Sequence, residues 1–241
     1  FIGANIRVPE ATLGDIDSQF AACAVGAARV HEMCRKYGAD TLTEAMAEMI
    51  AYVERRVRAA IAAIPDGTYV GEDALDDDGL SEAPLPIKAT VTVQGDSLTV
   101  DFAGTCPQVK SPMNAPYAST VSATLACIKS VLSGEDVPFN EGASRAVTVL
   151  APKGCLLNPL PPAPVRARME ASYRAYDAVL KALGQAMPDR AIACGYDTTT
   201  GFCLSHLQDG RYRVFLELRD GGYGASAVGD GCDAVAGPLS N

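Results

Sequence analysis

Four polar side chains on one loop are of the types that bind or activate an amide. Asp101, Thr105, Gln108 and Asn114 follow a strand-like run, in a stretch that contains one Gly and two Pro. A carboxylate beside three neutral hydrogen-bonding groups suits an amide or carboxylate ligand, and Asp101 would act as a general base if burial raised its pKa toward neutrality. The alternative is a loop whose side chains bond to its own backbone, and we favour that role for Asp101. The sequence therefore assigns no general base.

Three glycines near the end of the chain form a second candidate. Gly221, Gly222 and Gly224 follow another strand-like run, and the backbone N–H groups of such a segment can hold a phosphate. The cluster has neither the Gly-x-x-x-x-Gly-Lys-Ser/Thr spacing nor the Gly-x-Gly-x-x-Gly spacing, so its support for a nucleotide site is weak. We favour a tight loop in which two backbones approach closely. Together with the first loop, these glycines are the candidates for contact with a substrate or a partner.

Other catalytic chemistry has less support in the sequence. The two histidines, His31 and His206, are far apart and are expected in a helix and in a strand, which favours neither a His-based zinc site nor a His-activated nucleophile. The acidic stretch 72–79 lacks the alternation and the closing Glu of a calcium loop, so we expect a solvated turn. We predict no metal ligands within the chain.

Composition restricts the class of protein. The 241 residues are 48% hydrophobic and 20% charged, which excludes a disordered chain. A net charge of −9 disfavours nucleic acid and anionic lipid as partners. No apolar run approaches the ~20 residues of a membrane span. The eight cysteines lie in apolar runs without a Cys-x-x-Cys pair, so we expect buried, reduced thiols and a cytoplasmic protein. The ends at Phe1 and Asn241 are expected to be internal to a longer chain.

The elements that position these residues follow from periodicity. Apolar residues at three- and four-residue steps predict an amphipathic helix over Gly14 to Tyr37 and a second from Thr41, where Thr41-x-x-Glu44 resembles a capping box. The short connection favours antiparallel packing of the two helices. On the second helix, the basic residues among 54–58 are expected to form a solvated face with Glu partners. Two further helices are expected, from about 116 to 132 and from about 169 to 183.

A period of two predicts strands in the rest of the chain. The runs 69–70, 87–93 and 98–102 indicate a β-hairpin with an earlier strand beside it, 147–150 a further strand, and 198–207 with 212–218 a second hairpin. Helices and hairpins alternate without a βαβ repeat, so the predicted class is α+β, with helices packed on a mixed, largely antiparallel sheet. The sub-regions expected are a helical pair over 1–67 and an α+β part over 68–241.

Short motifs spread along nearly the whole chain resemble the hydantoinase B type subunit, which hydantoinases, 5-oxoprolinases and ketone carboxylases share. Each motif is weak alone, and their order makes the set specific. They are residues 5–9 with Gly14-Asp15, Tyr37-Gly38, residues 64–69, residues 76–79, residues 101–105 with Gln108 and Asn114, Asn140-x-Gly142, Pro152-x-Gly154, residues 157–159, residues 162–165, residues 221–225 and Asp230-Gly231.

The resemblance implies a part of a hetero-oligomeric enzyme. In the family, a hydantoinase A-like partner subunit carries ATP with Mg²⁺, and ATP activates a carbonyl of low reactivity. The leading expectation is a subunit of an ATP-dependent cyclic-amide hydrolase acting on hydantoin or 5-oxoproline. The alternatives are a subunit of an ATP-dependent acetone or acetophenone carboxylase, and a non-catalytic structural part of such a complex. The family's subunits are about twice as long, and the metal-rich segment of the ketone carboxylases lies outside this chain.

Overall fold

The computed structural model describes residues 1–6, 8–132, 134, 136–196, 198, 200–219 and 221–233. The chain divides into two compact units. The first contains Phe1–Met49 with Gly201–Leu218, and the second contains Ile50–Thr200 with the chain from Arg219 onward. The candidate loop and the glycine cluster both belong to the second unit.

A four-stranded mixed sheet forms the second unit. Its strands are β1 (Gly67–Leu75), β2 (Leu85–Gln94), β3 (Ser97–Asp101) and β4 (Val147–Leu150), in that order across the sheet. The β1–β2 and β2–β3 pairs are antiparallel, and β4 runs parallel to β3. The parallel pair needs a crossover, which contains helix α4 (Tyr117–Leu132) and the short 3₁₀ helix η1 (Glu141–Ser144). The predicted α+β class with a largely antiparallel sheet is confirmed.

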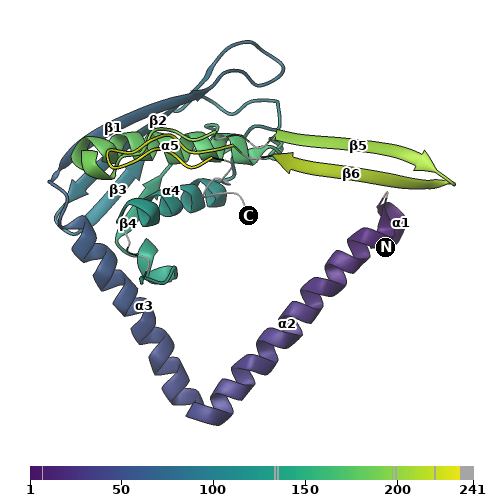
Figure 1. The fold of residues 1–241 in the computed structure, drawn as a ribbon, viewed down its shortest axis with the longest axis horizontal. Coiled ribbons are helices and arrows are strands. Elements are labelled where there is room, and N and C mark those ends of the chain that lie inside the picture. Colours follow the sequence, from purple (N-terminus) through teal and green to yellow (C-terminus); the bar gives the residue numbers. More distant parts are fainter. Residues whose placement is uncertain are drawn as a thin grey trace. The chain divides into compact units, whose positions relative to one another are not determined.

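One face of this sheet carries the core. Along β2, Ile87, Ala89, Val91 and Val93 are buried and alternate with more exposed residues, as expected for a sheet covered on one side. Helix α5 (Arg168–Ala186) covers β1 and β2, and α4 packs beside α5 (Figure 1). Close packing of α5 requires Gly71, because a Cβ there would lie 1.9 Å from the backbone oxygen of Ala178.

The long helices differ from the expectation in two respects. Helix α2 spans Pro9–Tyr37, after a short α1 (Ile2–Asn5), and α3 spans Ala39–Ile61. None of the described residues of α2 is buried, so the predicted antiparallel packing of the two helices is wrong: a short connection permits such packing but does not enforce it. The predicted capping box is also wrong, because α3 begins at Ala39 and Thr41 already lies inside it.

The remaining elements agree with the predicted pattern. The second hairpin consists of β5 (Thr200–Gln208) and β6 (Arg211–Arg219), and a 3₁₀ turn, η2 (Pro188–Arg190), follows α5. His31 lies within α2 and His206 within β5, as expected. The expectation of buried thiols holds for Cys127 and Cys155 alone among the eight cysteines, all of which are free. Two others are half-buried, and four are exposed: Cys23, Cys194, Cys203 and Cys232.

Candidate functional site

The candidate loop begins where β3 ends and is held by its own first residue. Asp101 pairs with Leu150 of β4 in the sheet register, and its Oδ1 accepts a hydrogen bond from the N–H of Ala103 at 2.9 Å. Gly104 then turns the chain with a φ of 96°, a conformation that favours glycine. The bond to Ala103 is the structural role that the sequence favoured for Asp101.

Two further side chains attach the loop to neighbouring segments. The Thr105 Oγ1 accepts a hydrogen bond from the Lys88 N–H at 3.2 Å and donates to the Lys88 carbonyl at 3.4 Å. The Gln108 amide accepts from the Leu160 N–H at 2.7 Å and donates to the Leu160 carbonyl at 3.3 Å. Thr105 therefore fastens the loop to β2, and Gln108 fastens it to the Pro-rich connector before α5.

Asn114 is the centre of the loop's hydrogen bonding. Its side chain is fully buried. The Oδ1 accepts from the Val109 N–H at 2.9 Å, and the Nδ2 group donates to the carbonyls of Val109, Ser111 and Pro164 at 2.9–3.0 Å. A carboxamide has two donor hydrogens and one acceptor oxygen, so this amide is fully used within the protein. The loop is thus a well-bonded scaffold, and a ligand that bound the Asn114 amide would have to replace these bonds.

The glycine cluster lies against a different segment. A Cβ on Gly221 would lie 2.3 Å from the Tyr196 Cβ, and one on Gly224 would lie 2.4 Å from the Ala193 Cβ. The Tyr196 N–H donates to the Gly222 carbonyl at 2.9 Å. These contacts are the close backbone approach that the sequence favoured over a phosphate site. The loop and the glycines bond to different partners, so the described hydrogen bonds do not bring the two candidates together.

A charged cluster that the sequence analysis missed lies where α5 crosses β1. The Asp73 carboxylate is 2.9 Å from the Lys181 Nζ and 3.6 Å from the Arg174 guanidinium. Arg174 also lies 3.6 Å from the almost fully buried carboxylate of Asp177. Arg174, Asp177 and Lys181 have i, i+3 and i+7 spacing, which places them on one helix face. This spacing, which is visible in the sequence, could have indicated that the three side chains lie together. It does not identify Asp73 as the strand residue that contacts them.

The expectation of a solvated acidic turn over 72–79 holds for three of the five acidic residues there, which are exposed, but not for Asp73 and Asp78. Asp73 belongs to β1 and faces α5. Asp78 is buried, and its Oδ1 accepts hydrogen bonds from the N–H groups of Leu80 and Ser81 at 2.9 and 2.7 Å. These bonds hold the pKa of Asp78 below its ordinary value. Both carboxylates are thus partnered and screened from water, which residue composition alone does not reveal.

The electrostatics of the cluster favour ion pairs over a metal. The Asp73 and Asp177 carboxylates and the Cys194 sulfur lie within 4.8 Å of one another and form a candidate donor set for a metal ion. Arg174 and Lys181 already neutralise these carboxylates. Burial opposes the charge of Lys181, yet its hydrogen bond to Asp73 and the nearby negative charges raise its pKa. Burial and then the charge of Asp177 raise the pKa of the neighbouring Cys127 thiol, which opposes formation of a thiolate.

A cavity of about 480 Å³ connects this cluster to the candidate loop. It is lined by Glu72, Asp73, Lys88, Gly104 and Lys181 among other residues. Lys88 and Glu72 lie 3.7 Å apart, so the cavity carries two pairs of opposite charge. Such a lining suits a polar ligand with both donor and acceptor groups. The candidate loop contributes Gly104 to this lining, whereas its four predicted site residues do not line the cavity.

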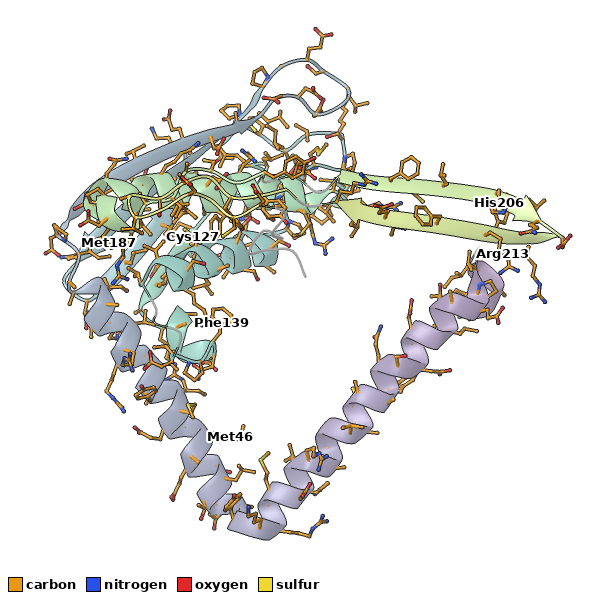
Figure 2. All side chains as sticks on the ribbon, in the orientation of Figure 1. Met46, Cys127, Phe139, Met187, His206 and Arg213 are labelled. Atoms are coloured by element: carbon orange, nitrogen blue, oxygen red, sulfur yellow. The ribbon has the colours of Figure 1, made fainter. Side chains whose placement is uncertain are left out.

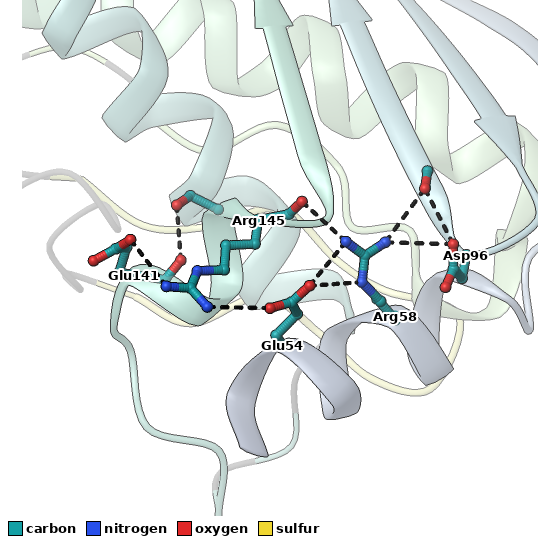
Figure 3. Close-up of polar contacts among 7 residues, drawn as sticks. Glu54, Arg58, Asp96, Glu141 and Arg145 are labelled. Atoms are coloured by element: carbon teal, nitrogen blue, oxygen red, sulfur yellow. Dashed lines mark hydrogen bonds and ion pairs between the residues drawn. The ribbon is translucent and has the colours of Figure 1, made fainter. Parts of the chain in front are cut away.

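The basic residues of α3 are engaged with carboxylates. Arg58 lies 2.9 Å from Glu54 and 3.4 Å from Asp96, and Arg145 lies 3.5 Å from Glu54 and 3.3 Å from Glu141 (Figure 3). Arg56 pairs with Asp136 at 2.9 Å. The predicted Glu partner is confirmed for Arg58, whereas Arg56 pairs with an Asp. The network fastens α3 to the β2–β3 turn and to η1. No helix among the described residues is long and apolar enough to cross a membrane.

Comparisons with known proteins agree with one another. The model of the family described as hydantoinase B/oxoprolinase matches residues 1–241. The putative D-/L-hydantoinase B-type subunit of a Pseudomonas species is 38% identical over 241 residues, which cover 96% of this chain and 40% of that protein. The crystal structure of the ATP-dependent caprolactamase from Pseudomonas jessenii has a TM-score of 0.85 at 29% identity, covering 98% of this chain and 41% of that one.

A more distant structure shares the fold. Nucleotide-free acetone carboxylase has a TM-score of 0.68 at 18% identity, over 87% of this chain and 30% of that one. The chain therefore spans about two fifths of the length of the hydantoinase subunit it matches.

Proposed function

We propose that this chain, which belongs to the hydantoinase B/oxoprolinase family, is part of a subunit that opens a cyclic amide in an ATP-dependent reaction. The observation that carries the proposal is the family match over residues 1–241. A hydantoinase subunit and an ATP-dependent caprolactamase among the similar proteins support it. Hydantoin, 5-oxoproline and caprolactam share a ring carbonyl bonded to nitrogen, so a common chemistry of ring opening accounts for all three names.

The need for ATP follows from the stability of the amide. Resonance makes an amide carbonyl a poor electrophile. Transfer of a phosphoryl group from ATP to the carbonyl oxygen makes the carbonyl carbon electrophilic, and water adds to it. The C–N bond of this adduct then breaks, the ring nitrogen leaves as an amine with a proton, and hydrolysis of the remaining acyl phosphate gives the carboxylate and phosphate. In the proposed complex, ATP and Mg²⁺ bind to a hydantoinase A-like partner subunit. Two relatives that are themselves named as subunits, one of a hydantoinase and one of a caprolactamase, support a hetero-oligomer.

Within this chain, we propose that the loop with Asp101, Thr105, Gln108 and Asn114 contacts the substrate or the partner through its backbone and its surface. The glycines 221, 222 and 224 are proposed for the same kind of contact. The saturated hydrogen bonding of Asn114 and Gln108 favours a supporting role over proton transfer. This observation also supports the second candidate function, a non-catalytic part of the complex.

The experiment combines the full-length subunit with its hydantoinase A-like partner and measures ATP hydrolysis and ring-opened product. Hydantoin, 5-oxoproline and caprolactam are compared with acetone plus bicarbonate. Stimulation of ATP hydrolysis by a cyclic amide, with stoichiometric ring opening, is the expected result. If acetone with bicarbonate stimulates ATP hydrolysis and no cyclic amide does, the proposed activity is that of a carboxylase and not of a hydrolase. The similarity of this chain to acetone carboxylase is a similarity of fold. Each of the two subunits, assayed separately, is the control.

A further inference from the structure

The middle of helix α2 has no charged, hydroxyl or amide side chain on any face. Residues 20–28, here called the apolar run, are one Phe, one Val, one Cys, one Gly and five Ala. They extend about 13 Å along the helix axis. The charged residues of the helix lie on either side of the run, with Asp17 the last before it and Arg29 the first after it. Arg29 pairs with Glu32 at 2.8 Å, and both side chains are exposed.

The apolar run is exposed around the whole helix. All nine residues are exposed, and its two largest side chains, Phe20 and Val25, are 69% and 61% exposed. Five helical steps place Phe20 and Val25 about 140° apart, on nearly opposite sides. Cys23, three positions after Phe20, lies on the Phe20 side. Side chains project from both sides of α2 (Figure 2), so the run presents apolar surface in more than one direction.

A helical segment of this composition is typical of a protein interior. A helix that is apolar on all sides is buried in the core of a large protein or in a membrane. Nine residues are too few for a membrane span, which takes ~20. The five Ala and Gly26 allow neighbouring helices to approach toward the short end of the usual interaxial distance, about 8 Å. The run therefore needs cover on opposite sides at once.

We propose that the apolar run of α2 is an interior segment, enclosed on opposite sides by parts of the same subunit that lie outside residues 1–241. The matched region is 40% of the similar hydantoinase subunit and 41% of the caprolactamase chain, so more than half of each lies outside it.

Another subunit is a less suitable occupant. An interface covers the side of a helix that faces the partner, whereas the opposite side still needs residues of its own subunit. A run of this kind that awaited another subunit would also promote aggregation of the free polypeptide. The inference rests on α2 and on the lengths of the relatives, and it is independent of the proposed activity.

Thiol labelling of the full-length subunit, without its partner, tests both sides of the run. The native Cys23 reports on the Phe20 side, and Val25→Cys reports on the opposite side. We expect both thiols to react with N-ethylmaleimide roughly 100-fold more slowly than in urea, because the reaction requires local opening of the structure. Mass spectrometry locates each labelled cysteine. Glu32→Cys lies beyond the run on the same helix, and this control should react rapidly.

The labelling pattern distinguishes the possible occupants. Protection of one of the two thiols alone would mean that a single side is covered. Protection that requires the hydantoinase A-like partner would assign the cover to that subunit, and protection that depends on subunit concentration would assign it to a second copy. Each of these results, or rapid labelling of both thiols, would overturn the proposal.

A thermal melt of Val25→Gln in the full-length subunit gives a second readout. Gln favours a helix more than Val does, so at an exposed position the melting temperature would stay the same or rise. In an enclosed run, the carboxamide loses its hydrogen bonds to water, and we expect a fall of several degrees or loss of folding. Glu32→Gln is the control and should change the melting temperature little. An unchanged or higher melting temperature for Val25→Gln would overturn the proposal.

Discussion

Replacing Asn114 separates a structural role of the candidate loop from a role in substrate binding. In Asn114→Ala, the partly buried N–H of Val109 loses its acceptor, and three carbonyls lose a shared donor. A buried donor left without a partner costs about 1–3 kcal/mol. With the lost carbonyl bonds, we expect a decrease of roughly 3 kcal/mol in the opening free energy of the loop. Gln108→Ala is the control and should cost about 1 kcal/mol or less, because its bonds are exposed to water.

The assay measures stability and turnover on the same variants. Hydrogen exchange at Val109 reports the opening free energy, and kcat/KM of the assembled complex is measured at a temperature where both variants are folded. A structural role predicts kcat/KM within about twofold of the natural subunit, since the amide does not touch the reacting atoms. A tenfold loss of kcat/KM, equivalent to about 1.4 kcal/mol, with unchanged exchange at Val109 would refute the reasoning.

Three further predictions concern packing, pH and the charged cluster. Gly71→Ala should reduce the melting temperature strongly or prevent folding, because its Cβ would lie 1.9 Å from a backbone oxygen of α5. Gly14→Ala is the control: it has open space around it and lies within helix α2, where Ala is favoured over Gly, so it should not lower the melting temperature. The hydrogen bond with Arg58 holds the pKa of Glu54 below its ordinary value, so its contribution is present at neutral pH and is lost as pH falls through that lowered pKa. Acid unfolding curves of Glu54→Gln should therefore show a weaker pH dependence below about pH 4.5, and an unchanged dependence would contradict this assignment. Lys181→Met should destabilise the chain, because the largely buried Asp73 then keeps only the more distant Arg174 as a cationic partner. Urea titration of Lys181→Met is compared with that of Lys181→Arg, which keeps the charge. Equal unfolding midpoints for the two variants would argue against an ion-pair role.

The elements were predictable from sequence because their signals are local. The alternation along β2 and the turn residues after it identify the first hairpin, and Asp209-Gly210 identifies the second. Pro65, Asp66 and Gly67, which follow the end of α3 at Ile61, are likewise a local signal that ends a helix. Such patterns depend on neighbours within a few residues, which a single sequence contains in full.

The contacts of the site were not predictable in the same way. Asp73 meets Arg174 and Lys181 from more than 100 positions away, and its own surroundings in sequence resemble a solvated acidic turn. The partners of Asn114 include the carbonyl of Pro164, which no local pattern indicates. The exposure of α2 was missed for a related reason: an amphipathic pattern shows that a face needs cover, but it does not identify the segment that covers it.

The hydrogen bonds of the candidate loop also determine when it can form during synthesis. The Phe102 N–H donates to Leu150, and the Gln108 N–H donates to Gly154, while the Asn114 side chain reaches Pro164. The loop therefore remains open on the ribosome until about fifty later residues have emerged, although β1, β2 and β3 can pair as soon as they are made. Bringing together segments so distant has an entropic cost that local hairpins avoid. Translational pausing between residues 101 and 164 would thus expose the edge of β3 that β4 later covers.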